Sequence, residues 1–234
     1  MKQLVNYFAG KKINKVLEVG AGTGDFIKVL KELFPGTEIT GIDPNTDSLE
    51  TAAKQYPEVQ FFKMQAESLV FKNNAFDVAA ISMALHHLSD IPRSLAEMRR
   101  VVKSGGWIIV AELFSDNLNP AQQNHRMYHH FRSKIDRLNG IQHNETFPKN
   151  EILKIVSDSG IKILFDFEVK YEANQNLNRV ELDERIQKMK AMLESLKGLD
   201  EYEILKPEIE NFRKKVLRFG FQPATRVVLV GQSN

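Results

Sequence analysis

The chain has 234 residues, of which 42% are hydrophobic, a formal net charge of +2 and no cysteine. This length suits one large α/β domain with a buried core, whereas two independent domains would each be small. A charge so close to neutral argues against nucleic acid as a partner, and the lack of cysteine excludes disulfides and a thiolate nucleophile. No stretch approaches the ~18 apolar residues of a membrane span, and no basic-then-apolar leader is present. We therefore expect a cytoplasmic protein with no nucleic-acid or membrane partner.

The most informative segment lies near the N-terminus, at residues 16–24. A short β-branched run leads through Glu18 into three glycines, Gly20, Gly22 and Gly24, and a helical pattern follows at once. Glycine allows positive φ there and lets a ligand approach the backbone closely. The spacing Gly-x-Gly-x-Gly is one residue shorter than the dinucleotide fingerprint, whose third glycine opens a helix onto a pyrophosphate. The turn therefore predicts a nucleoside cofactor and does not require a pyrophosphate.

Acidic residues stand at the ends of two predicted strands next to this turn. Glu18 ends the first strand, where a carboxylate suits an ammonium group and would repel a phosphate. Asp43 ends the next strand, at a spacing suited to hydrogen bonds with both hydroxyls of a ribose. Amides of the neighbouring loops could instead satisfy either carboxylate. With the glycine turn between them, we expect both to bind a nucleoside that carries an amino-acid tail.

Strand and helix patterns alternate along the chain, as a largely parallel α/β sheet requires. The predicted strands are 15–19, 38–43, 59–63, 76–83, 107–113, 161–170 and 225–231. The predicted early helices are 24–33, 46–55 and 92–101. Asp90 is the expected cap of the third helix, and Asp77 is expected to tether the start of the fourth strand. Ligands bind at the carboxyl ends of such strands, so the candidate residues converge at one edge of the sheet.

The segment 17–24, followed by Gly41, Ile42 and Asp43, resembles the class I S-adenosylmethionine-dependent methyltransferases. Further segments are similar to the same family and to its small-molecule branch: 66–71, 75–78, 85–88 and 105–107. The resemblance covers about residues 15–114. It implies an α/β fold with a Rossmann-like, seven-stranded, mostly parallel sheet, helices on both faces and an antiparallel last strand.

The resemblance also implies which residues bind S-adenosylmethionine. They are Glu18, Gly20, Ala21, Gly22, Gly24, Asp43, Pro44, Gln65, Ala66, Glu67, Ser82, Met83 and His87. The family usually has an acid where Gln65 stands, so the carbonyl of Gln65 or the carboxylate of Glu67 is expected to recognise the adenine amino group. His86 and His87 recur in the family as a pair, which favours a turn-capping role, and one of them is expected to face the methyl donor.

Two insertions interrupt the alternation, at about 115–148 and 171–223. In the second, two apolar stripes predict a helical hairpin: Leu182, Ile186, Met189, Leu193 and Leu196, then Leu205, Ile209, Phe212 and Val216. Such stripes favour a core or a dimer face over ligand contact. Whether the protein forms a homodimer is left undecided by the sequence. We predict one methyltransferase domain over 1–234 whose insertions form a substrate lid or an oligomer face, because a long loop after the fifth strand passes the mouth of the crevice.

Four of the six histidines fall in or near the first insertion. His125 and His129 are four residues apart, which suits a metal ion or a shared substrate contact, but also a solvated polar face of one helix. No third ligand is fixed by spacing and Arg132 stands nearby, so we predict no metal ion.

The sequence therefore predicts an enzyme that transfers the methyl group of S-adenosylmethionine to a small-molecule acceptor. The protein must chiefly align the two partners, an effect worth up to ~7–11 kcal/mol. A general base is needed only if the acceptor keeps its proton into the transition state, and the candidates are His130, His143 and His86. Two alternatives stay open: a methyltransferase-like S-adenosylmethionine-binding protein without transferase activity, and an NAD(P)-binding oxidoreductase.

Overall fold

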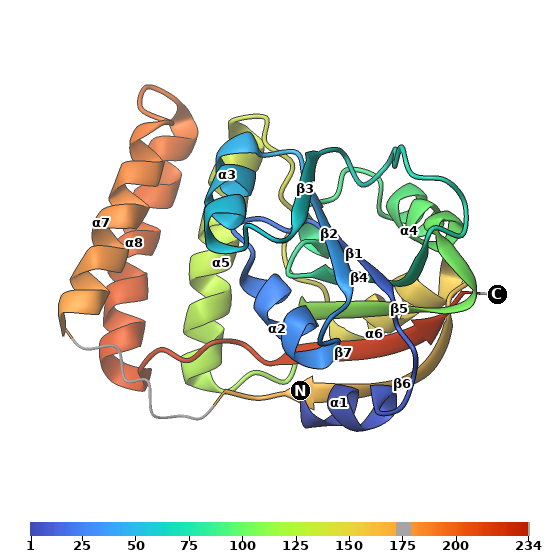
Figure 1. Ribbon diagram of the computed structural model, residues 1–234. Coiled ribbons are helices and arrows are strands. Elements are labelled where there is room, and N and C mark those ends of the chain that lie inside the picture. The colour runs from blue at the N-terminus through green and yellow to red at the C-terminus, as the bar shows by residue number, and fades with distance from the viewer. Residues whose placement is uncertain (172–178, 234) are drawn as a thin grey trace. The chain divides into compact units, whose positions relative to one another are not determined.

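The computed structural model describes residues 1–171 and 179–233, and the chain forms two compact units (Figure 1). The sheet unit consists of Met1–Glu112, Asn150–Val169 and Val227–Asn234. The helical unit consists of Leu113–Lys149 and Lys170–Arg226. The predicted insertions at 115–148 and 171–223 therefore supply most of the helical unit. Residues 172–178 of the second insertion lie outside the described part of the chain.

One sheet of seven strands, counted over the described residues, has the order β3-β2-β1-β4-β5-β7-β6. The strands are β1 (Lys15–Val19), β2 (Glu38–Asp43), β3 (Gln60–Lys63), β4 (Phe76–Ser82), β5 (Val102–Leu113), β6 (Lys162–Val169) and β7 (Arg226–Gln232). The pairs from β3 to β5 are parallel. The N–H of Gly105 donates to the Ser233 carbonyl, and that of Phe114 to the Thr225 carbonyl. Residue numbers therefore increase along β5 while those of the bonded partners decrease. The strands β5 and β7 are antiparallel, as predicted.

Helices connect the strands of the sheet unit. They are α1 (Lys2–Phe8), α2 (Asp25–Leu33), α3 (Thr46–Gln55), the 3-10 turn η1 (Leu85–His87), α4 (Ile91–Val101) and α6 (Lys149–Asp158). The Asp90 side chain accepts the N–H of Arg93 and caps α4, which confirms the predicted cap. The predicted elements end within a few residues of the observed ones, except that β5 begins at Val102 rather than at residue 107. Helices α1 and α6 were not predicted.

Asp77 ties three strands together at the end of the sheet opposite the candidate site. Its Oδ2 accepts the N–H groups of Asn14 and Lys15 at 2.8 and 2.9 Å. Its Oδ1 lies 2.6 Å from Nζ of Lys103. These bonds join the beginnings of β1, β4 and β5, which confirms the expected tethering role.

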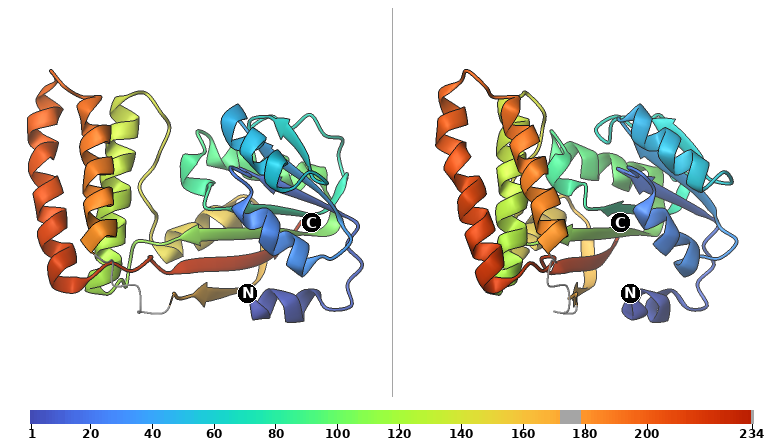
Figure 2. Two further views of the ribbon diagram at one scale, coloured as in Figure 1. Left: turned by 60° about the vertical axis from the view of Figure 1, so that its left-hand side comes forward. Right: turned by 90° about the vertical axis from the view of Figure 1, so that its left-hand side faces the viewer.

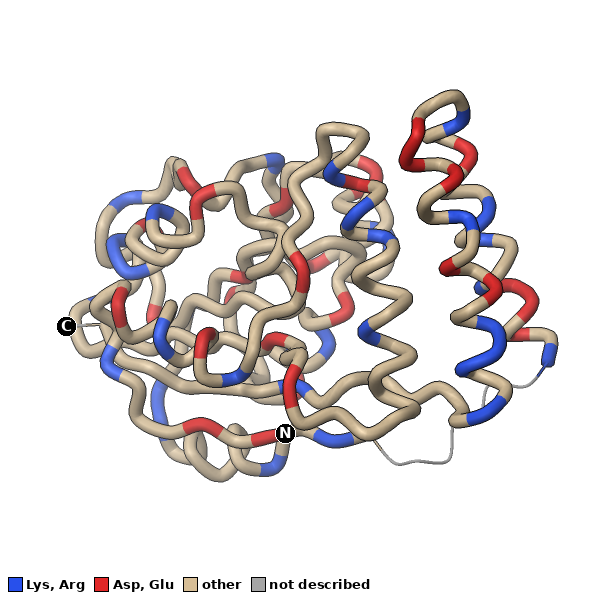
Figure 3. Tube along the Cα trace, turned by 180° about the vertical axis from the view of Figure 1, so that it is seen from behind, with Lys and Arg blue, Asp and Glu red and all other residues tan. Residues whose placement is uncertain are grey.

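In the described residues of the helical unit, the helices are α5 (Pro120–Leu138), α7 (Arg179–Glu194) and α8 (Asp200–Phe219), which lie side by side (Figure 2). Phe131 and Ile135 of α5 are buried in one apolar cluster with both predicted stripes of the hairpin. The stripes therefore form a core, as predicted. Basic and acidic positions are intermixed along α7 and α8 (Figure 3). Among the described helices, none is long and apolar enough to cross a bilayer.

Truncation of the core of the helical unit should cost far more than truncation of its surface. Phe212 is fully buried in this core, so Phe212→Ala should lower the free energy of unfolding by about 3–5 kcal/mol. Leu217 of the same helix is 69% exposed, and Leu217→Ala should change it by less than about 0.5 kcal/mol. Urea unfolding followed by circular dichroism measures both variants. Equal losses would contradict the assignment of this core.

Candidate functional site

The glycine turn joins β1 to α2 at the carboxyl end of β1, an interior strand of the sheet. Gly20, Gly22 and Gly24 have φ of +73°, +50° and +92°, which side chains rarely adopt. A Cβ on Gly20 would lie 2.5 Å from the Cβ of Ala84, so glycine is required there by packing. A Cβ on Gly22 would meet no atom within 4 Å, so this glycine leaves open space at the backbone. The turn is therefore packed on one side and accessible on the other.

Hydrogen bonds to β2 hold this turn in place. The N–H groups of Gly20 and Ala21 donate to the carbonyl of Ile42 at 2.9 and 2.8 Å. The N–H of Gly22 donates to Asp43 Oδ2 at 2.9 Å, and Asp43 Oδ1 accepts the N–H of Asn45 at 2.8 Å. The half-buried Asp43 carboxylate thus braces the turn, and its remaining lone pairs can accept further hydrogen bonds.

Glu18 has a buried carboxyl group with an unsatisfied oxygen. The residue is 1% exposed, and its Oε2 has no hydrogen-bond partner among the described residues. Its neighbours in register on β2 and β4 are Gly41 and Ala80, which offer no polar side chain. Burial, followed by repulsion from Asp25 and Asp43, raises the pKa of Glu18 well above its ordinary value. This oxygen therefore requires a proton or a cationic ligand.

The loop after β3 carries the residues expected to reach an adenine. Gln65 is exposed and Ala66 is buried. Glu67 Oε1 accepts the N–H and the hydroxyl of Ser89 at 3.0 and 2.7 Å, and the N–H of Asp90 at 3.2 Å. Glu67 thus fastens this loop to the start of α4, whereas the side chain of Gln65 extends into solvent.

The chain turns sharply at the end of β4. Met83 has φ of +57°, and its N–H donates to the Ala111 carbonyl at 2.8 Å. A positive φ outside glycine is uncommon and is concentrated at functional sites. The neighbouring Ser82 is half-buried, while Pro44 at the end of β2 is exposed. Residues Glu18, Asp43, Ser82 and Met83 therefore stand at the carboxyl ends of three adjacent strands, as predicted.

Glu112 is a residue of this edge that the sequence analysis missed. It lies in β5, is fully buried, and its Oε1 is 2.9 Å from Nδ1 of His86. Its Oε2 accepts the N–H of Leu85 at 3.0 Å. The His86 side chain is buried and that of His87 is exposed. An acid inside an otherwise apolar predicted strand was the signal that could have identified Glu112.

His130 of α5 lies inside the helical unit. Its Nε2 is 2.9 Å from Thr146 Oγ1, and its Nδ1 is 3.2 Å from a Glu145 carboxylate oxygen. Burial lowers the pKa of His130, against the opposing charge of Glu145. His130 also lines a cavity of about 640 Å³ whose wall includes Met127, Phe131 and Phe219.

The other two histidines of α5, His125 and His129, contact different partners. The Nδ1 of His125 accepts the N–H of Ala224 at 3.1 Å, and burial, followed by the Arg185 charge, lowers the pKa of His125 to about 4. His129 instead meets His143, with 3.3 Å between their Nε2 atoms. The interpretation of His125 and His129 as a solvated polar face is therefore wrong for His129. This residue is half-buried and contacts the buried His143.

Comparison with known proteins agrees with this geometry. Residues 17–110 match the family model described as a methyltransferase domain. The demethylmenaquinone methyltransferase of Thermotoga maritima is 34% identical over 116 residues, which cover 50% of this chain and 51% of that protein. That of Chlorobaculum tepidum is 25% identical over 178 residues, which cover 70% of this chain and 72% of that protein. The chain thus spans about half the length of the Thermotoga maritima relative.

Solved structures show the same fold. A Bacillus halodurans C-125 protein, described as a candidate methyltransferase, superposes with a TM-score of 0.66 at 16% identity, over 100% of this chain and 99% of that one. The YcgJ protein of Bacillus subtilis gives 0.61 at 18% identity, over 100% and 97%. The chain therefore has the fold of these solved structures, and residues 17–110 are similar to the methyltransferase-domain family. The resemblance found in the sequence is confirmed.

Replacement of Glu18 by glutamine should stabilise the ligand-free protein at neutral pH. Because the folded-state pKa of Glu18 is raised, its favourable contribution is present below the unfolded pKa of about 4.3 and is lost as the pH rises through the folded pKa. Glu18→Gln removes that loss. Urea unfolding at several pH values measures the difference between variant and wild type, which should widen as the pH rises.

Glu32→Gln, on the exposed face of α2, is the matched control and should behave as wild type at every pH. A stability difference for Glu18→Gln that does not change with pH would contradict the raised pKa.

Proposed function

We propose that this protein transfers the methyl group of S-adenosylmethionine to a small-molecule acceptor. The observation that carries the proposal is the buried, unpartnered Glu18 oxygen beside the open backbone at Gly22. S-adenosylmethionine carries two positive groups, an ammonium and a sulfonium, and its adenosine must approach the backbone closely. The buried carboxyl of Glu18 and the open backbone at Gly22 therefore fit this cofactor. The Gly-x-Gly-x-Gly spacing and the family match favour it over NAD(P).

Each part of the cofactor has a candidate partner at the carboxyl edge of the sheet. We assign the ammonium to Glu18 and the ribose hydroxyls to the remaining lone pairs of Asp43. The adenine amino group is assigned to the carbonyl of Gln65. Glu67, whose Oε1 accepts from Ser89 and Asp90, keeps its Oε2 as the alternative acceptor. The remaining predicted contacts along this edge are Gly20, Ala21, Gly24, Pro44, Ala66, Ser82, Met83 and His87.

The bound cofactor supplies the activated methyl carbon, which leaves alignment as the main task of the protein. Precise alignment of two reactants is worth up to ~7–11 kcal/mol. The glycine turn is suited to this task because its amides are fixed to Ile42 and Asp43 before any ligand binds.

The acceptor is proposed to be a small aromatic or apolar molecule. The similar proteins from Thermotoga maritima and Chlorobaculum tepidum are named for demethylmenaquinone, which supports a quinone-type ring.

The chain enters the helical unit directly from the carboxyl end of β5. We propose that this unit, with 115–148 acting as a lid, selects the acceptor, and that its 640 Å³ cavity beside His130 takes part. The cytoplasmic location and a homodimer stay predictions.

A histidine is proposed to accept the proton when the acceptor is a hydroxyl or an amine. His86 is held by the buried Glu112, as an orienting carboxylate holds a catalytic base. His130, beside Glu145, and His143, beside Asp136, have the same kind of partner. Each of the three therefore remains a candidate.

Incubation with labelled S-adenosylmethionine and a demethylmenaquinone tests the proposed reaction. Transfer of label to the quinone, absent in Gly22→Val, is the expected result. Binding of the cofactor without transfer to this quinone or to a pool of small metabolites would contradict the proposal and favour a binding protein.

Asp43→Ala should weaken S-adenosylmethionine binding by about 2–4 kcal/mol, because it removes charge-assisted hydrogen bonds and the brace on Gly22. Isothermal titration calorimetry measures the affinity. Asp47→Ala, at an exposed position of α3, is the matched control and should bind as wild type. Unchanged affinity in a folded Asp43→Ala protein would overturn the ribose assignment.

Single alanine variants of His86, His130 and His143 should leave cofactor affinity within about twofold of wild type. At least one should lower kcat by about 100-fold or more, the usual contribution of a general base. Turnover and calorimetric affinity are measured for each variant. Normal turnover in all three would exclude histidine base catalysis and leave alignment alone.

A further inference from the structure

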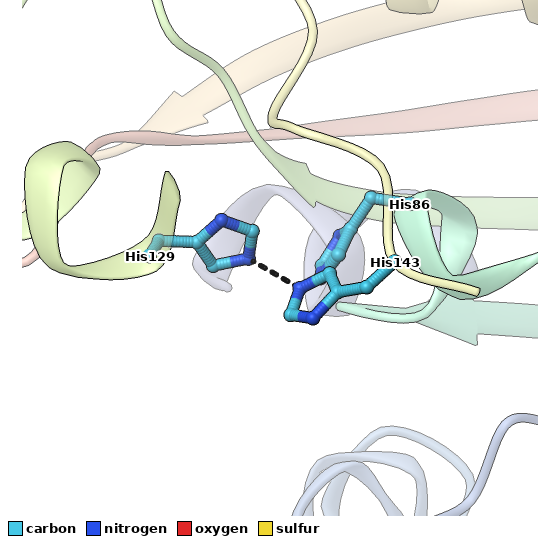
Figure 4. A group of neighbouring side chains, drawn as sticks. All are labelled: His86, His129 and His143. Carbon is cyan, nitrogen blue, oxygen red and sulfur yellow. Dashed lines mark hydrogen bonds between the residues drawn. The ribbon is translucent and has the colours of Figure 1, made fainter. Parts of the chain in front are cut away.

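The helical unit contains a row of three titratable side chains outside the cofactor site. Asp136 and His129 lie on the same helix, α5, and His143 lies on the segment that follows it. Nδ1 of His143 is 2.6 Å from Asp136 Oδ2. Nε2 of His143 is 3.3 Å from Nε2 of His129, and the two rings point toward one another (Figure 4). The row therefore presents two imidazole nitrogens side by side.

We propose that His129 and His143 bind a divalent transition-metal ion through these two nitrogens. Two nitrogens at a zinc–nitrogen distance of about 2.0–2.1 Å in a tetrahedral site lie about 3.3–3.4 Å apart. The observed separation of 3.3 Å equals that edge of the tetrahedron. An ion would take the place of the proton that these two nitrogens share in their hydrogen bond.

The environment of His143 fits the second shell of a metal site. A histidine ligand almost always donates its other ring N–H to a carboxylate or carbonyl, which fixes the tautomer and raises the basicity of the ligating nitrogen. Asp136 occupies this position. The Arg132 side chain, which would repel a cation, lies 3.5 Å from the same Asp136 carboxylate and is 56% exposed. Its charge is therefore offset and screened.

The two ligands are held before any ion binds. Arg137 donates to the main-chain carbonyl of His143 at 2.7 Å, which fixes the segment that carries this histidine. His143 is 1% exposed, and His129 is fixed by the helix. Imidazole ligands suit zinc, cobalt, nickel and copper, whereas magnesium and calcium prefer oxygen. The site thus selects a borderline transition metal.

Two coordination positions remain for water or for oxygens of a small molecule. A metal ion lowers the pKa of a coordinated water or hydroxyl group. This inference does not depend on the proposed methyl transfer, because the geometry alone carries it. The sequence did not reveal the pair, because its two members are fourteen positions apart.

Titration of the full chain with zinc chloride, and with cobalt chloride as a spectroscopic probe, tests the site. Calorimetry should show one zinc per chain, and ring nitrogen resonances of His129 and His143 should shift in proton–nitrogen NMR spectra. His129→Ala and His143→Ala should each weaken zinc binding by at least 100-fold. Asp136→Asn, which keeps the side-chain volume, should weaken it by about 10–100-fold.

His125→Ala is the matched control from the same helix and should bind zinc within about twofold of wild type, because His125 is used by the Ala224 N–H. Circular dichroism confirms that each variant is folded. Absence of zinc binding to the wild type would overturn the proposal and leave a hydrogen-bonded histidine pair. Wild-type affinity in either histidine variant, or unshifted resonances of the pair, would overturn it as well.

Discussion

The burial of the Glu18 carboxyl is the constraint on which the proposed cofactor site depends. Glu18 lies one residue before the end of β1, the strand between β2 and β4, and its register neighbours Gly41 and Ala80 offer no polar side chain. Asp25 and Asp43 add two further carboxyl groups to the same small region. A protein gains no stability from such an arrangement, since burial and repulsion both oppose ionisation. The arrangement is useful if a ligand brings positive charge to it, and S-adenosylmethionine brings two positive groups.

The same region shows how one set of bonds fixes the glycine turn that we propose as the binding site. Asp43 braces Gly22, and the carbonyl of Ile42 accepts the amides of Gly20 and Ala21. These bonds fix the turn without a ligand, so little further ordering is needed when one binds. Glu112 repeats the pattern at the end of β5, where it holds both the Leu85 amide and the His86 ring. Along this edge, structural carboxylates prepare positions that a ligand can use.

Local patterns in the sequence predicted most of the sheet unit, because its strands are short apolar runs separated by proline, glycine or capped helices. The helical stripes that contain Met189 and Phe212 were predicted for the same reason. Contacts between distant residues could not be predicted. The row of Asp136, His143 and His129 depends on how the segment after α5 folds back, and the Glu112–His86 contact depends on the pairing of β4 with β5. The division into two compact units also became visible only in three dimensions.

The most direct test of this account is the proton balance when S-adenosylmethionine binds. Glu18 has a raised pKa in the ligand-free protein, and a cationic ligand favours its ionised form, so binding should release a proton from it. Calorimetry at a series of pH values above the ordinary glutamate pKa of about 4.3, repeated in buffers of different ionisation enthalpy, measures this release. The account predicts net proton release by the wild type that disappears in Glu18→Gln. Binding with the same proton balance in both proteins would contradict it.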